Sequence, residues 1–499
     1  MVVVTTKTTR PLTRTRRGAP AAAAPVLTAG HTTGPATGNP TRLTTSGLLT
    51  VLLGAALAPI DLFIVNVALP TIQADLHASA ATLEWVVAGY GIGFALLLVI
   101  GGRLGDAFGR RRLFSVGLAA FTLTSLVCGL APNAGVLVLA RAAQGAAAAM
   151  LVPQVLSIIQ ATTAGERRAR TLGYYGATGG ISMVIGQLLG GVLVAADLGG
   201  AGWRPIFLVN VPIGLLAMLL AHRTLPETRA ANPIGVDLWG TVLLGASLLA
   251  LLVPLMEGAG LGWPLWCWLL LAAFPVISAV FFLVERRLED RGGVPLLPPS
   301  VLRVPSMRRG LLIAVPFFGG FGAFMFVYAL LLQDGLHLSP LESGLALTPT
   351  ALSFLATTLL VARLVERFGR WVMVAGAVVL VVSLLVLIGT TLLAWPHLGV
   401  LDLVPGTLLF GMGQGLAAPT LFRLILSQVP AESAGVGSGM LTTTQQTSLA
   451  LGVATLGSLF AALSASTGVE HALVIVSSVQ VLTSIAIGLL AIGLPDPRT

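Results

Sequence analysis

The sequence predicts an all-α membrane protein with fourteen transmembrane helices, arranged as two six-helix bundles with two extra helices between them. Three observations support this fold class: an apolar composition, a long series of apolar segments and a basic loop that occurs twice. Of the 499 residues, 56% are hydrophobic and only 9% are charged, and the mean hydropathy is +0.94. A soluble domain of this length cannot bury so much apolar surface, so the bilayer must solvate most of the chain.

Apolar runs of roughly 20 residues recur along the chain, and each can cross a hydrocarbon core of ~30 Å as a helix. The runs are too long and too little alternated to be strands of a barrel. The predicted spans are 46–69, 82–102, 113–131, 135–160, 170–196, 204–222, 237–256, 265–284, 310–333, 343–364, 371–394, 401–427, 434–463 and 471–494.

Basic residues gather in every second connection between these spans. They precede span one and occupy the loops after spans two, four, six, eight and ten, whereas the opposite loops carry Arg204 alone. Because basic loops stay in the cytoplasm, we expect both termini there, in a multi-pass protein of the plasma (inner) membrane. Lys7 is the only lysine among 28 basic residues, a bias that indicates a GC-rich bacterial genome. The +9 charge lies in the N-terminal tail and short loops, so no nucleic-acid partner is expected.

One basic loop occurs twice, 260 positions apart. Residues 103–110 (RLGDAFGR) and 363–370 (RLVERFGR) share five of eight residues, and both have an acid in fourth place. Eight predicted spans separate the copies, so both lie on one side of the membrane and the halves are parallel repeats. If each half had only six spans, only six spans would separate the two loops. The extra pair is most simply spans seven and eight.

The predicted organisation has five parts. Residues 1–45 are rich in Thr, Ala, Pro and Arg, and they indicate a disordered cytoplasmic tail, not a cleaved signal peptide. The parts that follow are the N-terminal bundle, the extra helices with a basic linker, the C-terminal bundle and a short cytoplasmic tail, at 46–222, 223–309, 310–494 and 495–499.

Five segments resemble motifs of the major facilitator superfamily and, within it, of the fourteen-helix drug:proton antiporter branch. They are similar to the motifs of the loop after helix two, helix four, helix one, the entry to helix six and the lead-in to helix ten: 102–112 (GRLGDAFGRRR), 139–145 (LARAAQG), 61–70 (DLFIVNVALP), 203–214 (WRPIFLVNVPIG) and 339–344 (SPLESG). Pro205 stands where the branch usually has a second aromatic residue. The resemblance covers roughly residues 46–494 and implies a secondary transporter with a central substrate site.

The resemblance implies that the loop after helix two holds the cytoplasmic gate closed. The resemblance assigns this role to residues in both copies of the loop: Gly102, Asp106, Gly109, Arg110 and Arg111, with Glu366, Gly369 and Arg370. The alternative is that the arginines only set the topology and bind anionic lipid.

Span five is dense in glycine. Gly186 and Gly190 are four residues apart, and with Gly191 they permit close helix packing. The family's antiporter motif has this glycine pattern, usually with a proline where this chain has Gln187. The departure leaves symport or facilitation open beside antiport.

Asp61 and Arg141 are the predicted proton-coupling residues. Asp61 is the only acidic residue clearly inside a span of the first half, where a lone charge costs ~3 kcal/mol or more. At ~1.5 Å per residue, both residues lie ~20 Å from the inner surface and can pair if their helices face each other. Desolvation favours a neutral carboxyl group and a guanidinium favours a charged one, so such a pair can gain and lose a proton. A static ion pair is the alternative.

Polar residues inside other spans are candidates for the substrate cavity. Gln144 lies three residues after Arg141 and either orients it or contacts substrate. The other candidates, for which packing between helices is the alternative, are Gln187, Thr443, Gln445 and Gln446.

The sequence therefore predicts a proton-coupled transporter that exports drugs, antibiotics or other amphiphilic small molecules by alternating access. It has no phosphate-binding glycine loop, nucleophile elbow or metal motif, so we expect neither an enzyme nor an ATP-driven pump, and no cofactor or metal. We expect a monomer whose partners are a small-molecule substrate, protons and the lipid bilayer. Three alternatives stay open: a dedicated exporter of one endogenous metabolite, an uncoupled facilitator, and a receptor or scaffold derived from a transporter.

Overall fold

The computed structural model describes residues 43–229, 235, 237–430 and 434–495, and this part of the chain is helical without strands. Fourteen helical segments within it are long and apolar enough to cross a membrane, which confirms the predicted fold class. Nearly all of the predicted N-terminal tail, and residues 496–499, lie outside the described residues.

The helices follow the order of the predicted spans. The first half contains α1 (Thr45–Leu76), α2 (Ala80–Phe108), α3 (Arg110–Gly129), α4 (Ala134–Thr162), α5 (Gly165–Ala195), the turn η1 (Leu198–Gly200), and α6 and α7 (Pro205–Leu208 and Asn210–Thr224). Next come α8 (Leu238–Leu261), α9 (Leu265–Asp290) and the short α10 (Pro299–Arg303). The second half contains α11 (Pro305–Leu330), η2 (Leu331–Gly335), α12 (Pro340–Phe368), α13 (Trp371–Ala394), α14 (Val400–Leu426), α15 (Ala434–Gly452), η4 (Val453–Gly457), α16 (Ser458–Thr467) and α17 (Val469–Ile492).

The first helix is longer than its predicted span. The prediction of 46–69 stops before Pro70, but α1 continues to Leu76 and ends where His77 adopts a left-handed backbone conformation with φ 49°. Proline removes one helical hydrogen bond, and in membrane helices neighbouring groups can satisfy the carbonyl that this frees. At the start of α1, the hydroxyl of Thr44 accepts a hydrogen bond from the amide of Gly47 at 3.0 Å.

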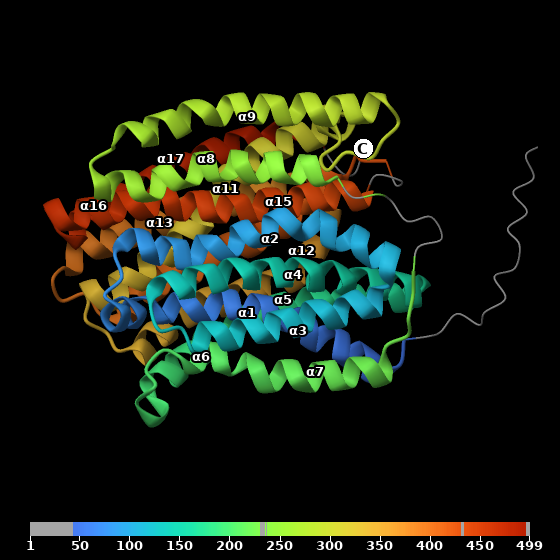
Figure 1. Ribbon diagram of the computed structural model, residues 1–499. Coiled ribbons are helices and arrows are strands. Elements are labelled where there is room, and N and C mark those ends of the chain that lie inside the picture. Colours follow the sequence, from blue (N-terminus) through green and yellow to red (C-terminus); the bar gives the residue numbers. More distant parts are fainter. Residues whose placement is uncertain (1–42, 230–234, 236, 431–433, 496–499) are drawn as a thin grey trace, which may run out of the picture. The chain divides into compact units, whose positions relative to one another are not determined.

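Each half packs mainly within itself. In the first half α4 packs against α2 and α3, and α1 packs against α5 and α7; in the second, α14 packs against α12 and α13, and α17 against α13 and α11. The main contacts between the halves are α5 with α12 and α2 with α15. The extra helices α8 and α9 pack against each other at one edge of the helical array (Figure 1), and α8 also contacts α2 and η4.

The arginine-rich loops define one end of the helices. We call the end with residues 109–112 and 369–370 the inner end, and the end with residues 77–79 and 336–339 the outer end. The candidate site lies between them.

Candidate functional site

A network of buried polar side chains surrounds the carboxyl group of Asp61 on α1. Arg141 on α4 donates from Nη1 to Asp61 Oδ2 and, at 2.7 Å, to Gln144 Oε1. Asp61 Oδ1 accepts from Gln144 Nε2 at 2.8 Å and from Asn210 Nδ2, on α7, at 2.9 Å. Asp61 and Arg141 are both 0% exposed. The structure thus brings Asp61, Arg141 and Gln144 together within the first half.

Tyr90 on α2 lies between this network and a cavity. The guanidinium carbon of Arg141 is 4.5 Å from the centroid of the Tyr90 ring, and Tyr90 also lines the cavity. Arg141 Nε donates to the carbonyl of Val86 at 3.0 Å, while Arg141 Nη2 is buried without a hydrogen-bond partner. Asp61 and Arg141 are not among the lining residues, so the charged pair lies behind the cavity wall.

Sequence reasoning did not assign Asn210 or Tyr90 to the site. Asn210 Nδ2 also donates to Ser125 Oγ on α3 at 3.0 Å, so this one amide connects α1, α3 and α7. The sequence signal that could have pointed to Asn210 is that it is a polar residue inside the largely apolar segment 203–214. Among the described residues, no group of three or more His, Cys, Asp or Glu could hold a metal ion.

A central cavity of about 510 Å³ lies between the two halves. Its walls come from α1, α2, α4 and α5 on one side and from α11, α12, α14 and α15 on the other. Most of the lining is apolar, and eight of its side chains are aromatic: Phe63, Tyr90, Phe94, Tyr175, Phe318, Phe321, Phe354 and Phe422. A few polar groups interrupt it: Thr178, Thr358, Gln414, Thr442, Gln445 and Gln446. An apolar site with few polar groups suits an amphiphilic small molecule.

The five candidate cavity residues take different places. Gln445 and Gln446 line the cavity, whereas Gln144 belongs to the Asp61 network. Thr443 donates to the carbonyl of Ala95 on α2 at 3.4 Å. Each residue turns a helix by roughly 100°, so position 443 points away from the face that 442, 445 and 446 share. Gln187 is buried at 3.7 Å from Met325 Sδ, off the cavity wall.

Close backbone contacts hold α5 against α1 within the first half and, at the outer end, against the start of α12 in the second half. A Cβ atom at Gly186 or Gly190 would lie 2.8 Å or 2.9 Å from a carbonyl oxygen of α1, and one at Gly191 would lie 2.9 Å from the carbonyl of Pro340 at the start of α12. Gln333 Nε2 donates to the carbonyl of Val67 at 2.6 Å and joins η2 to α1. In contrast, a Cβ at Gly179, nearer the inner end and on the cavity wall, would meet nothing within 4 Å.

The first copy of the repeated loop bonds within itself and to the segment that follows α7. Arg110 donates from Nη2 to Asp106 Oδ1 at 2.8 Å, and the amide of Arg111 donates to Glu227 Oε1 at 3.2 Å. Gly109 has φ 112°, and a Cβ there would lie 2.5 Å from the same Glu227 oxygen. Gly102 is less crowded, because a Cβ there would have Pro153 Cβ as its nearest neighbour, at 3.8 Å.

In the second copy, Arg370 bonds within the second half. Arg370 Nη1 donates to the carbonyl of Leu494, just after α17, at 2.9 Å. Gly369 has φ 57°, a positive value that glycine adopts without strain. Glu366 is exposed. The hydrogen bonds of Asp106, Arg110, Arg111 and Arg370 described above therefore do not connect residues 46–222 to residues 310–494.

Arg103 has a place that the sequence did not indicate. The predicted spans place it in the loop after span two, but it lies within α2 and is only 7% exposed. Its Nη1 donates to the carbonyls of Gly235 at 3.1 Å and Val294 at 3.2 Å. These carbonyls flank α8 and α9, so Arg103 attaches the extra helices to the inner end of α2.

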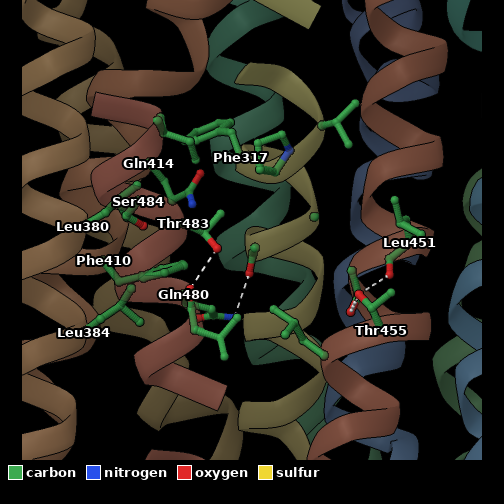
Figure 2. Close-up of a pocket in the computed structure, with 18 residues that line it drawn as sticks. Phe317, Leu380, Leu384, Phe410, Gln414, Leu451, Thr455, Gln480, Thr483 and Ser484 are labelled. Carbon is green, nitrogen blue, oxygen red and sulfur yellow. Dashed lines mark hydrogen bonds between the residues drawn. The ribbon is translucent and has the colours of Figure 1, made fainter. Parts of the chain in front are cut away.

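A smaller side pocket of about 230 Å³ lies inside the second half, between α11, α13, α14, α17 and the segment that includes η4. Figure 2 shows Gln480, Thr483 and Ser484 of α17 on one wall, near Phe317 and Phe410. Gln414 lines both this pocket and the central cavity. The side pocket is therefore a neighbour of the central cavity.

Comparison with known proteins gives the family. The Major Facilitator Superfamily model matches residues 51–453. The chain belongs to the major facilitator superfamily. It is 37% identical over 435 residues to the "Probable actinorhodin transporter" of Streptomyces coelicolor, covering 86% of this chain and 74% of that protein. It is 36% identical over 432 residues to "Puromycin resistance protein pur8" of Streptomyces alboniger, covering 85% and 83%.

Another major facilitator relative is named for multidrug resistance. "Multidrug resistance protein Stp" of Mycobacterium tuberculosis is 32% identical over 437 residues, covering 87% of this chain and 78% of that protein. Solved structures agree in fold: a POT family transporter has a TM-score of 0.65 at 11% identity, covering 90% of this chain and 96% of that chain. For the xylose transporter XylE from E. coli the TM-score is 0.59 at 16% identity, covering 88% and 94%. The family and these bacterial relatives are transporters, which is consistent with a many-span protein of the plasma membrane.

Proposed function

We propose that this protein exports antibiotics or other amphiphilic small molecules from the cytoplasm, in exchange for protons, by alternating access. The observation that carries the proposal is the buried Asp61–Arg141 pair, which is separated from an amphiphile-sized cavity by the ring of Tyr90. Relatives that are named for transport of, or resistance to, antibiotics support the substrate class.

The coupling step is a proton transfer to Asp61. When a proton binds at Oδ2, the oxygen that accepts from Arg141, the carboxyl group becomes neutral and Arg141 loses its counter-charge. A buried guanidinium without a counter-charge is costly, so Arg141 must find other acceptors or move toward water. Its unpartnered Nη2 and its contact with Tyr90 make the cavity wall the first part to respond.

Closure at the outer end supports a state that receives substrate from the inner side. Gly191 against Pro340, and Gln333 against Val67, hold the outer ends of the halves together. Residues 46–222 and 310–494 are the proposed moving bodies, and residues 223–309 move with the first of them because Arg103 bonds to their loops. In the outward-facing state, we infer that the Asp106 and Glu366 loops stabilise the closed inner end.

Orientation and assembly complete the proposal. The arginine-rich inner end lies in the cytoplasm together with both termini, and the protein works as a monomer in a bacterial plasma membrane. No nucleic acid, cofactor or catalytic step takes part.

The second candidate is a dedicated exporter of one metabolite made by the same cell. A relative whose name gives one compound, actinorhodin, favours it, whereas the aromatic cavity with few polar groups favours several amphiphiles. The remaining alternatives are an uncoupled facilitator, raised by Gln187, and a receptor or scaffold derived from a transporter.

A drug-sensitivity panel on a deletion strain and an overexpressing strain tests the substrate class, followed by vesicle transport of any active compound. The proposal expects lower sensitivity on overexpression and loss of vesicle transport with an uncoupler. Uptake that is unchanged by the uncoupler would favour the facilitator, and a single transported compound would favour the dedicated exporter.

A further inference from the structure

Glu84 is a buried carboxyl group that the proposed function does not use. It lies in the first turns of α2, near the outer end, and is 1% exposed. Its two oxygens lie 2.7 Å and 2.8 Å from the hydroxyl oxygen of Ser458, at the start of α16 in the second half. Glu84 thus joins the two halves where the outer end is closed.

The hydrogen bonds around Ser458 indicate a proton on Glu84. Ser458 Oγ also lies 3.0 Å from the carbonyl of Ala454 and 3.4 Å from that of Leu255 on α8, so one hydroxyl proton faces four acceptor oxygens. A neutral carboxyl group can donate from one oxygen to Ser458 Oγ and accept the Ser458 proton on the other, which fits both short distances. An ionised carboxylate would leave its two oxygens to share one proton.

The surroundings of Glu84 offer no compensating cation. Below it, apolar side chains of α2, α8, α15 and η4 pack together: Ala88, Ile92, Leu252, Met256, Ala450 and Ala454. Within the described part of the chain, Glu84 makes no ion pair. A carboxylate buried this way is costly unless it is paired or neutral.

The charged groups on the neighbouring helices are engaged elsewhere. Glu257 on α8 accepts from Trp85 Nε1 at 2.9 Å and adds a second negative charge nearby. Arg141 on α4 is paired with Asp61 on α1. The arginines of α3 lie at the inner end. Residues 453–467, which form η4 and α16, contain no ionisable side chain.

We propose that Glu84 is a second proton-binding site, which must be neutral for the outer end to close. Closing packs α2, α8 and α16 around the carboxyl group and takes up a proton; opening admits water and releases it. Because the closed state holds the extra proton, acid favours closing and alkali favours opening. One linked proton changes the ratio of closed to open protein by up to about tenfold per pH unit. The inference uses one part of the proposed function, alternating access, in which the outer end opens.

Distance measurements between spin labels test this directly. Ala74→Cys at the end of α1 and Ala465→Cys near the end of α16 place labels on two exposed positions in opposite halves. Cys128 and Cys267 are buried, so they are shielded from the labelling reagent. Between about pH 5 and about pH 9, the fraction at long distance should rise in the protein with native Glu84. In Glu84→Gln, which keeps the shape and one donor, the short distance should dominate at every pH.

Glu257→Gln is the matched control, because it removes the neighbouring charge and should keep the pH response. Ser458→Ala removes the partner and should lower the closed fraction at acid pH. Infrared spectroscopy gives a label-free check: a band of a protonated carboxyl group should vanish in Glu84→Gln and persist in Glu257→Gln.

Distances that do not change with pH, or a Glu84→Gln variant that keeps the full response, would overturn the inference. Proton-coupled transport with a pH-independent outer end would refute the Glu84 site and leave the proposed function standing. A pH-dependent outer end in a transporter without proton coupling would support the Glu84 site and refute the proton coupling of the proposed function.

Discussion

The ring of Tyr90 lies 4.5 Å from the guanidinium carbon of Arg141 and also forms part of the cavity wall. A change in the charge of Asp61 therefore has a short route to the substrate through Arg141 and one aromatic ring. Asp61 itself does not line the cavity. In this account, proton and substrate act on one helix, α2, from different sides.

Substitutions of Tyr90 should distinguish the contribution of its ring to transport from that of its hydroxyl group. Tyr90→Phe should export at nearly the unmodified rate, because the ring stays and the hydroxyl's bond to the carbonyl of Ala58 is long, 3.5 Å. Tyr90→Ala removes a cation–π contact worth about 0.5–2 kcal/mol, which corresponds to a loss of roughly two- to thirtyfold in rate. The measurement is the initial rate of pH-gradient-driven uptake into inverted vesicles at matched expression. Equal losses in both variants would contradict the role of the ring.

Asp106→Asn should impair transport while substrate affinity stays nearly intact. Asp106 bonds to Arg110 at the inner end and does not line the cavity. Equilibrium binding of a transported drug and its efflux are measured side by side. The matched control is Glu166→Gln, which breaks another inner-end pair at the same helical spacing and should change little, since exposed pairs contribute about 0–1 kcal/mol. A large loss of binding by folded Asp106→Asn would refute the gate role.

Filling the side pocket should show whether substrates use it. A side chain at Gly320 would enter open space on the pocket wall, so Gly320→Leu should fold well and weaken binding of large substrates more than small ones. Gly389 on α13 also has no neighbour within 4 Å of a Cβ and does not line the pocket, so Gly389→Leu is the control. Unchanged affinity for every substrate in Gly320→Leu would exclude the pocket from binding.

Cysteine labelling in intact cells should give the orientation. Ala196→Cys lies at the outer end after α5, and Ala161→Cys lies near the inner end of α4; both positions are exposed. Because arginine-rich loops stay in the cytoplasm, a membrane-impermeant maleimide should label position 196 in intact cells and position 161 only after permeabilisation. The opposite pattern would reverse the proposed orientation and the direction of transport.

The fold was largely predictable because membrane spans depend on length and composition. Fourteen apolar runs and alternating arginine loops required no knowledge of which helices touch. Span ends were less predictable: Pro70 does not end α1, since a membrane helix tolerates proline where neighbours satisfy its backbone. Equal depth also anticipated that Asp61 and Arg141 could pair, which the structure places in contact.

The partners of these residues could not be predicted in the same way. Asn210, Tyr90 and Ser458 take their places through rotations of the helices about their axes, which apolar runs do not specify. Glu84 lies only two residues inside its predicted span, 82–102, where a charge is normally solvated. Its burial depends on α8 and α16, distant in sequence, which cover it.

The central claim is that Asp61 carries the coupling proton. Asp61→Asn keeps the side-chain shape and fixes a neutral state, so drug should still bind while gradient-driven export collapses. Asn66→Ala, on the same helix, is the control, because it adds no charge. The measurement is pH-gradient-driven drug uptake into inverted vesicles, with expression checked. The account predicts loss of uptake in Asp61→Asn and not in the control. Uptake by Asp61→Asn at the unmodified rate, still abolished by an uncoupler, would show that the proton travels elsewhere.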